Sequence, residues 1–245
     1  HNARQARQAF RHALDAGFEH LSLDLIYGVP GQSLSSWRQS LEEALGLEPE
    51  HLSTYALSFE PGTPLDEMRN AGRVAEADTS LQEQCYRLAI DLAGRAGLEH
   101  YEISNFARPG RRCLHNLVYW NNEPYLGLGP AAASYVAGIR QVNRPDLDQY
   151  LAALRRGVEP PANSEQLAGR AMEAETLMLG LRLIEGVDRR QFAERFGEDP
   201  LDAFPNSIGR YARIGALEVT DTHLRVASPY LFVADTILAD ILAEQ

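Results

Sequence analysis

Apolar residues recur at helical spacing at the very start of the chain, at Ala6, Phe10 and Leu14. This spacing predicts an amphipathic helix over residues 2–16, which Gly17 can end in a left-handed conformation. The helical pattern is already under way at the first residues. We therefore expect the sequence to be part of a longer protein.

Strand and helix patterns then alternate along the chain. Residues 21–27 are almost all apolar, which is typical of a parallel strand covered on both faces. Further strand patterns occur at 51–59 and 99–104, and helical patterns lie between them, around Trp37 and over 80–96. This alternation predicts a parallel α/β sheet or barrel, whose first strand needs further strands upstream to pair with.

The second half of the chain has a different pattern. Residues 105–144 are rich in Gly, Pro, Asn and aromatic side chains, as functional loops often are, and a helix at 146–156 leads to a double-proline linker. The segments expected beyond it are helices over 164–183, 189–196 and 203–214, strands at 217–219 and 224–226, and a final helix. Helices with a hairpin outline a winged-helix-like domain, so we expect one domain over 1–158 and another over 159–245.

The charge of the chain argues against some classes of binding partner. The formal net charge is −11, and all 23 positive side chains are arginine, which excludes lysine-dependent phosphate binding and Schiff-base catalysis within this sequence. A winged-helix outline raises DNA binding as an alternative, but from residue 164 onward 8 Arg stand against 14 Asp plus Glu. We therefore predict no nucleic-acid partner and a structural or docking role for this domain.

The two cysteines, Cys85 and Cys113, cannot hold a metal cluster by themselves. Thiolate sites use three or four closely spaced cysteines, or two cysteines with close histidines. A disulfide is not expected because no secretion signal precedes them. No run approaches the roughly eighteen apolar residues of a membrane span, so we expect a cytoplasmic protein that is not integral to a membrane.

Asp24 is the first candidate for chemistry. A carboxylate inside an apolar strand needs a partner, and α/β proteins bind ligands at the carboxyl ends of their strands. The alternative is a buried carboxylate that only caps the backbone. Residues 28–32 (Gly-Val-Pro-Gly-Gln) add a rigid turn at the same end, which by itself shapes a tight connection.

The segment His-Asn-Leu-Val-Tyr-Trp at 115–120 is the second candidate. Imidazole can ligate iron, the amide can form hydrogen bonds, and the two aromatic rings offer stacking faces. This mixture suits a flat aromatic ligand. The alternative is a structural histidine that is hydrogen-bonded beside aromatic rings.

Several of these segments, taken in order, resemble one family. The segments are DLIYGVPGQ at 24–32, HLSTY at 51–55, YEISNF at 101–106 and HNLVYW at 115–120, with further matches at 125–130, Arg140, Asn143 and 175–186. The family is that of the HemW-type heme chaperones, also called oxygen-independent coproporphyrinogen III oxidase-like proteins, of the radical S-adenosylmethionine superfamily. Several long motifs in one order make the resemblance specific.

The resemblance implies an α/β fold, namely the C-terminal part of a partial (β/α) radical-SAM barrel followed by a small helical, winged-helix-like domain. It implies a [4Fe-4S] cluster on a CxxxCxxC motif upstream of His1, so no metal ligand is expected in this chain, and S-adenosylmethionine beside the cluster. Asp24 matches a carboxylate that contacts S-adenosylmethionine, and Ser58 falls near a main-chain contact to it. The HNxxYW signature associated with heme is matched by His115, Asn116, Tyr119 and Trp120.

One position departs from the family pattern. The family usually has Gly-Ala-His-Ser where residues 131–134 read Ala-Ala-Ala-Ser, so Ala133 replaces a histidine. Alanine can neither ligate iron nor move a proton, which leaves His115 as the nearest imidazole and the axial heme ligand open. Cys113 lies close enough in sequence to be tested as a ligand.

The resemblance implies a heme chaperone that binds heme and hands it to hemoproteins, with the cluster and S-adenosylmethionine in a supporting role. The alternative is an oxygen-independent coproporphyrinogen III dehydrogenase, which decarboxylates its substrate oxidatively to protoporphyrinogen IX. A third hypothesis, suggested by Ala133, is a degenerate relative that keeps the fold as a docking module. Whether the protein is an enzyme stays open on the sequence.

Overall fold

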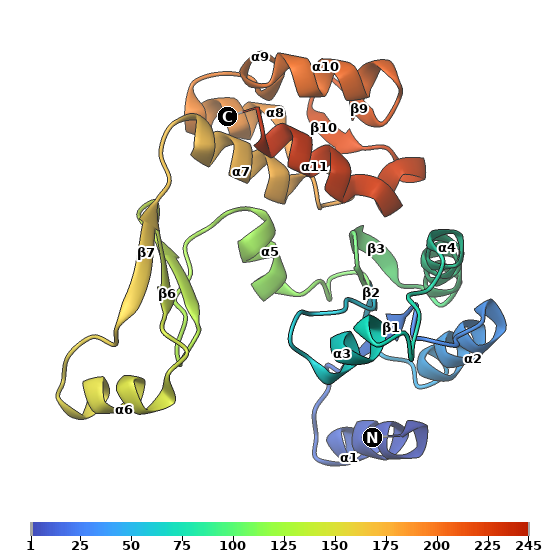
Figure 1. The fold of residues 1–245 in the computed structure, drawn as a ribbon. Coiled ribbons are helices and arrows are strands. Elements are labelled where there is room, and N and C mark those ends of the chain that lie inside the picture. The colour runs from blue at the N-terminus through green and yellow to red at the C-terminus, as the bar shows by residue number, and fades with distance from the viewer. Residues whose placement is uncertain (1, 245) are drawn as a thin grey trace. The chain divides into compact units, whose positions relative to one another are not determined.

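A computed structural model describes residues 2–244. The chain forms two compact units, one ending at Cys113 and one beginning at Leu114 (Figure 1). The domain boundary expected between residues 158 and 159 stays a prediction, because the contacts divide the chain earlier, just before the HNLVYW segment. Among the described residues no helix is long and apolar enough to span a membrane.

The first unit is built on a four-stranded sheet in the order β1-β2-β4-β3. Its strands are β1 (Ser22–Tyr27), β2 (His51–Ala56), β3 (Glu99–Glu102) and β4 (Asn105–Ala107). Its helices are α1 (Ala3–Asp15), α2 (Leu34–Leu45), α3 (Pro64–Asn70) and α4 (Thr79–Arg95). The helices expected at the start and over 80–96 are confirmed within one residue at each end, since their apolar spacing is strong.

The sheet is mixed, and it differs from the expected parallel sheet by one additional strand, β4. β1 and β2 are parallel, as the α2 crossover between them requires. β4, however, pairs antiparallel with both β2 and β3. The cause is local: only Ile103 and Ser104 separate β3 from β4, and so short a connection can join only antiparallel neighbours.

The helices α2 and α4 cover one face of this sheet. Trp37 and Leu41 of α2 and Cys85 of α4 are almost fully buried there, and the Trp37 indole donates to the Cys85 carbonyl at 2.9 Å. Along β1, by contrast, Asp24 and Ile26 are exposed. The expectation that this strand is covered on both faces is therefore wrong for the described chain, which leaves the second face open.

The second unit begins with α5 (Leu114–Trp120), followed by a three-stranded antiparallel sheet in the order β5-β6-β7. The strands are β5 (Ala133–Val136), β6 (Ile139–Asn143) and β7 (Ala162–Gln166), and α6 (Leu147–Arg155) lies between the last two. Residues 105–144 are thus more regular than expected. The helix expected from residue 164 is wrong at its start, because residues 164–166 belong to β7, whose sequence Ala-Asn-Ser-Glu-Gln carries no apolar alternation.

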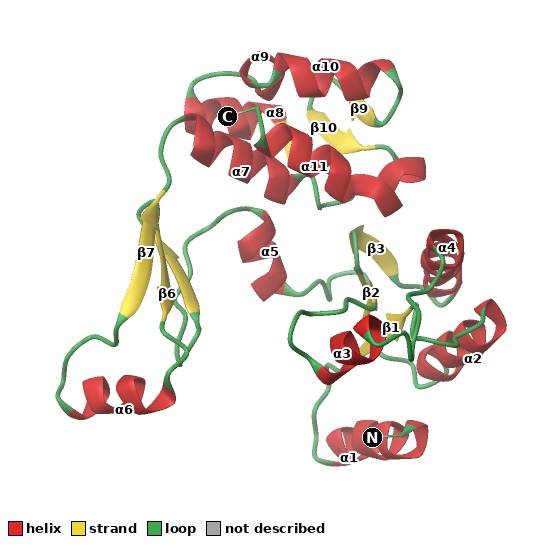
Figure 2. Cartoon of the chain, viewed as in Figure 1, coloured by secondary structure: helices red, strands yellow, loops and turns green. Residues whose placement is uncertain are grey.

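The rest of this unit is a helical module with a small sheet of order β8-β10-β9 (Figure 2). Its elements are α7 (Arg170–Gly180), β8 (Val187–Asp188), α8 (Arg189–Phe196), α9 (Pro200–Ala203), α10 (Pro205–Arg213), β9 (Leu217–Val219), β10 (His223–Val226), η1 (Ser228–Val233) and α11 (Ala234–Leu242). Leu177, Leu181, Phe204, Ile237 and Ile241 form its buried core. Helices plus a hairpin confirm the winged-helix-like outline.

Candidate functional site

The open face of the first sheet carries polar side chains from β1 and β2. Asp24 lies directly opposite Ser53, and Ile26 opposite Tyr55, in the parallel register. Burial raises the pKa of the Tyr55 hydroxyl, and the Asp24 carboxylate adds to the rise through a side-chain hydrogen bond and its charge. In the described residues Asp24 is therefore an exposed carboxylate beside a tyrosine hydroxyl.

His51 on the same face was missed as a candidate from sequence. Its Nδ1 lies 2.9 Å from the Ser22 hydroxyl and its Nε2 lies 2.9 Å from the Tyr101 hydroxyl. Burial lowers the pKa of His51, and the charge of Asp24 opposes that shift. His51 thus links β1, β2 and β3 at the amino end of the parallel strands. Contacts at that end contribute to the stability of the sheet.

The loops at the carboxyl ends of β1 and β2 lie next to each other. The turn at 28–32 begins with Gly28 at φ +74°, and the Gly28 amide donates to the Gln32 side chain at 2.7 Å. The Leu57 amide donates to the Tyr27 carbonyl at 2.8 Å, which ties the end of β2 to β1. Ser58 follows directly and is exposed. The structure therefore brings Ser58 and this turn to the same edge of the sheet.

Glu102, the carboxylate at the end of β3, is fully buried. One of its oxygens accepts the Ser104 amide at 3.0 Å, and the Asn105 side-chain amide also donates to it. These bonds hold the short connection between β3 and β4. Glu102 also contributes, with its charge, to the raised pKa of Tyr55, so it belongs to the surroundings of the open face.

In the second unit, α5 carries the HNLVYW segment at one end of an aromatic array. His115 is exposed, and its ring meets the Tyr119 ring edge-on at 4.8 Å. Tyr119 in turn meets Tyr125 at 4.5 Å, and Tyr125 lies 6.3 Å from Tyr135. Tyr125 and Tyr135 are also joined by two backbone hydrogen bonds of 2.9 Å, which fixes the array to β5.

Arg140 ends the array on the side of β6. Its guanidinium lies 5.7 Å from the Tyr135 ring and donates to Glu175 of α7 at 2.7 Å and to Glu165 at 3.2 Å. Glu175, whose side chain is only 12% exposed, is the main cause that raises the pKa of Arg140. Sequence resemblance singled out these positions, but only the fold shows that they meet.

Trp120, at the end of α5, has different neighbours. The Arg182 guanidinium lies over its ring at 4.7 Å. Asn116 is half-buried on the same short helix. The structure therefore keeps His115, Asn116, Tyr119 and Trp120 together on α5 but gives the imidazole and the indole separate surroundings.

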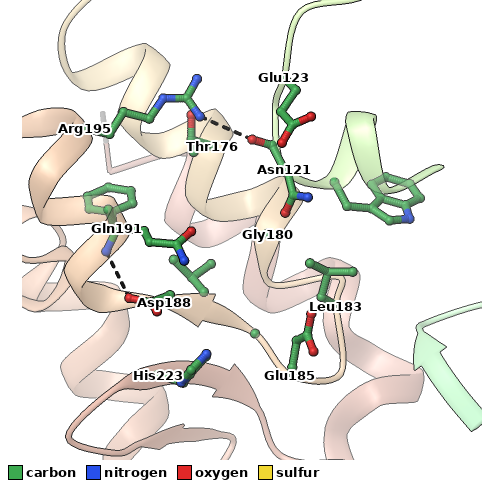
Figure 3. Close-up of a pocket in the computed structure, with 14 residues that line it drawn as sticks. Asn121, Glu123, Thr176, Gly180, Leu183, Glu185, Asp188, Gln191, Arg195 and His223 are labelled. Atoms are coloured by element: carbon green, nitrogen blue, oxygen red, sulfur yellow. Dashed lines mark hydrogen bonds between the residues drawn. The ribbon is translucent and has the colours of Figure 1, made fainter. Parts of the chain in front are cut away.

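A pocket of about 360 Å³ lies beside the end of α5 within the second unit (Figure 3). Its wall includes three carboxylates, and Arg195 donates to the Asn121 carbonyl at 3.2 Å at its rim. The three carboxylates are Glu123, Glu185 and Asp188. This negative lining disfavours an anionic ligand in the pocket itself.

The two cysteines are free thiols, and burial raises the pKa of Cys85. In the described residues 2–244 no group of three or more His, Cys, Asp or Glu side chains could hold a metal ion. The residues present therefore do not fit an iron-sulfur cluster. Ala133, where the resemblance implies a histidine, lies on β5 opposite Val142.

Comparison with known proteins identifies relatives of this chain. Residues 171–228 match the model of the HemN C-terminal domain. The whole chain is 30% identical over 244 residues to "Heme chaperone HemW" of Bacillus subtilis (strain 168), and covers 64% of that protein. The chain thus resembles the HemW-type heme chaperones over its whole length. This confirms the resemblance carried by the sequence motifs.

Further relatives extend the likeness. The Synechocystis "Heme chaperone HemW" is 39% identical over 192 residues, which cover 76% of this chain and 46% of the relative. "Radical S-adenosyl methionine domain-containing protein 1, mitochondrial" of Danio rerio is 28% identical over 263 residues, covering 100% of this chain and 57% of the relative. The chain thus spans about half to two thirds of the length of these relatives.

The solved structure of coproporphyrinogen III oxidase (HemN) from Escherichia coli, a radical SAM enzyme, shares the fold. The TM-score is 0.78 at 18% identity, with 100% of this chain and 60% of that chain covered. The expected fold class is therefore confirmed: part of a radical-SAM (β/α) barrel followed by the HemN-type C-terminal domain. The assignments of Asp24, Ser58 and the α5 side chains to ligands stay predictions.

Proposed function

We propose that the full-length protein binds heme on α5 and hands it to hemoproteins, in the cytoplasm or at the membrane surface. The observation that carries this proposal is the exposed His115 imidazole at the end of the tyrosine array. Leucines next to the array are also exposed, by 77% at Leu114, 77% at Leu126 and 89% at Leu128. Exposed apolar side chains beside an imidazole suit a large, flat, iron-bearing ligand. The curated relatives named heme chaperones support the same function.

Heme titration of the full-length protein tests this proposal. We expect a saturable change in the Soret band, and we expect His115→Ala to weaken heme binding by about tenfold or more, the effect of losing roughly 1.4 kcal/mol. His12→Ala is the matched control, because His12 is an exposed histidine on α1 and should leave the titration unchanged. A wild-type protein with no saturable Soret change would reject heme binding altogether.

We further propose that Asp24 and the loop at Ser58 bind S-adenosylmethionine on the open face of the first sheet. An exposed carboxylate beside a hydroxyl can accept hydrogen bonds from an ammonium group or from ribose hydroxyls, so these residues fit the ligand. Bound beside a [4Fe-4S] cluster, this cofactor supplies radical chemistry. The cluster cysteines would come from a part of the full-length protein outside this sequence.

Asp24→Asn in the full-length protein is expected to raise the dissociation constant of S-adenosylmethionine by about tenfold, because an amide loses the charge-assisted hydrogen bond. Equilibrium dialysis measures this directly. Asp15→Asn, an exposed change at the end of α1, is the matched control. Equal affinity in wild type and Asp24→Asn would remove Asp24 from the site.

The fold shared with HemN keeps oxidative decarboxylation of coproporphyrinogen III as a second candidate function. Reconstituted full-length protein, supplied anaerobically with reductant, S-adenosylmethionine and coproporphyrinogen III, distinguishes the two. Formation of protoporphyrinogen IX would favour the enzyme. Heme transfer to an apo-hemoprotein without that product would favour the chaperone and would also argue against a degenerate docking module.

A further inference from the structure

We infer that Arg182, stacked on Trp120, is the residue that receives a propionate carboxylate of heme; this inference rests on the proposed heme-binding function. The guanidinium carbon of Arg182 lies 4.7 Å from the centre of the Trp120 ring. Trp120 belongs to the segment on α5 that we propose as the heme site. Arg182 follows α7, 62 positions after Trp120 in the chain, and no sequence motif links the two.

Two buried N–H groups of this pair have no hydrogen-bond partner. They are the indole Nε1 of Trp120 and the Nε of Arg182. Indole and guanidinium nitrogens only donate hydrogen bonds, so the missing partner is an acceptor. Native proteins rarely leave buried donors unpaired, and an orphaned donor points to a group that the protein binds. Two orphaned donors on stacked side chains therefore point to one acceptor that reaches both.

The charge of Arg182 identifies the class of that acceptor. Its ion pair with Asp235 is long, at 3.4 Å, and the Asp235 side chain is 91% exposed. A solvent-exposed pair of this kind contributes little. Arg189, by comparison, holds Asp199 through three hydrogen bonds of 2.9 to 3.3 Å. Arg182 thus keeps most of its capacity for a carboxylate, which is the planar acceptor that a guanidinium prefers.

The distance between His115 and Trp120 along α5 bears on whether one heme can reach both side chains. His115 and Trp120 are five residues apart, which corresponds to about 7.5 Å along a helix axis. Heme carries its two propionates on one edge, away from the iron. The His115 and Trp120 side chains project about 140° apart around that axis, so a heme held at His115 would have to pass around the end of α5 to bring its carboxylate edge to Arg182. Trp120 also lines the adjacent pocket, whose three carboxylates would repel a heme carboxylate from that side.

The experiment compares hemin with hemin dimethyl ester, in which both propionates are esterified, as ligands of the full-length protein. Soret titrations are carried out with wild type, Arg182→Gln, Arg182→Lys and Arg190→Gln. Arg190→Gln is the matched control because Arg190 is 85% exposed on α8 and forms an ion pair with its helical neighbour Glu194. Circular dichroism checks that each variant is folded.

We expect wild type to bind hemin about tenfold more tightly than the ester, as the loss of one charge-assisted interaction predicts. Arg182→Gln should lose that preference by binding hemin more weakly while its affinity for the ester stays unchanged. Arg182→Lys, which keeps the positive charge, should retain part of the preference, and Arg190→Gln should behave as wild type.

An equal loss of affinity for hemin and ester in Arg182→Gln would overturn the inference, because it would mean that Arg182 only supports α5. An unchanged preference for hemin in that variant would overturn it as well. If Arg182→Gln does not fold, Arg182→Lys decides instead. Equal affinities of Arg182→Lys for hemin and for its dimethyl ester would contradict the inference. Failure of wild type to bind either ligand would instead reject the proposed function.

Discussion

Gly186→Ala is expected to lower the free energy of unfolding of the C-terminal module by about 4 kcal/mol, a large effect for one methyl group. Gly186 has φ +79°, and a Cβ there would overlap the Leu224 carbonyl oxygen and lie 2.5 Å from the Arg225 Cβ. The obstacle is the backbone of β10, which pairs with β8 directly after Gly186. Rotation of a flexible side chain cannot relieve it. Chemical denaturation followed by circular dichroism measures the loss.

Gly197→Ala is the control for that prediction. Gly197 ends α8 at φ +88°, and an added Cβ would meet no heavy atom within 4 Å. Alanine there is strained only by its backbone conformation, which costs about 1 kcal/mol. Equal destabilisation by the two changes would show that the overlap with β10 is relieved by backbone movement, contrary to our expectation.

Glu175→Gln is expected to lower the free energy of unfolding by roughly 2–3 kcal/mol, because it removes the better buried of the two carboxylates that pair with the largely buried Arg140 guanidinium. The Arg140 and Glu175 side chains are 25% and 12% exposed, and they are joined at 2.7 Å. Arg140 also lies over Tyr135, and the Tyr125 side chain interacts with it. The same change should therefore disturb the rings that lead to His115 and shift the Soret band of the heme-loaded, full-length protein.

Glu165→Gln separates the two carboxylates that Arg140 contacts. Glu165 lies 3.2 Å from Arg140 but is 59% exposed, so its pair is worth at most about 1 kcal/mol. We expect little change in stability and none in the heme spectrum. A heme spectrum that responds equally to both substitutions, or to neither, would contradict the role assigned to Glu175.

Local patterns predicted the helices and strands whose apolar residues repeat clearly. α8 and β9 have the expected bounds, and α4 differs by one residue at each end. β4, α5 and the β5-β6-β7 sheet were not predicted. β4 has three residues and α5 has seven, while β7 carries polar side chains that show no period. Elements this short, or this polar, depend on partners elsewhere in the chain more than on their own propensity.

For the candidate site, too, the sequence indicated some features, and only the tertiary structure showed the others. The sequence by itself determined the family resemblance and the HNxxYW segment, and it predicted the two ligand classes, because motifs are runs of neighbouring residues. Only the tertiary structure decided that Asp24 is exposed beside Tyr55, and that Arg140 joins the array to Glu175. It also decided that Arg182 lies over Trp120. These pairs are separated by 31 to 62 positions in the sequence, and contacts at such separations arise from the packing of helices and strands, which no local pattern encodes.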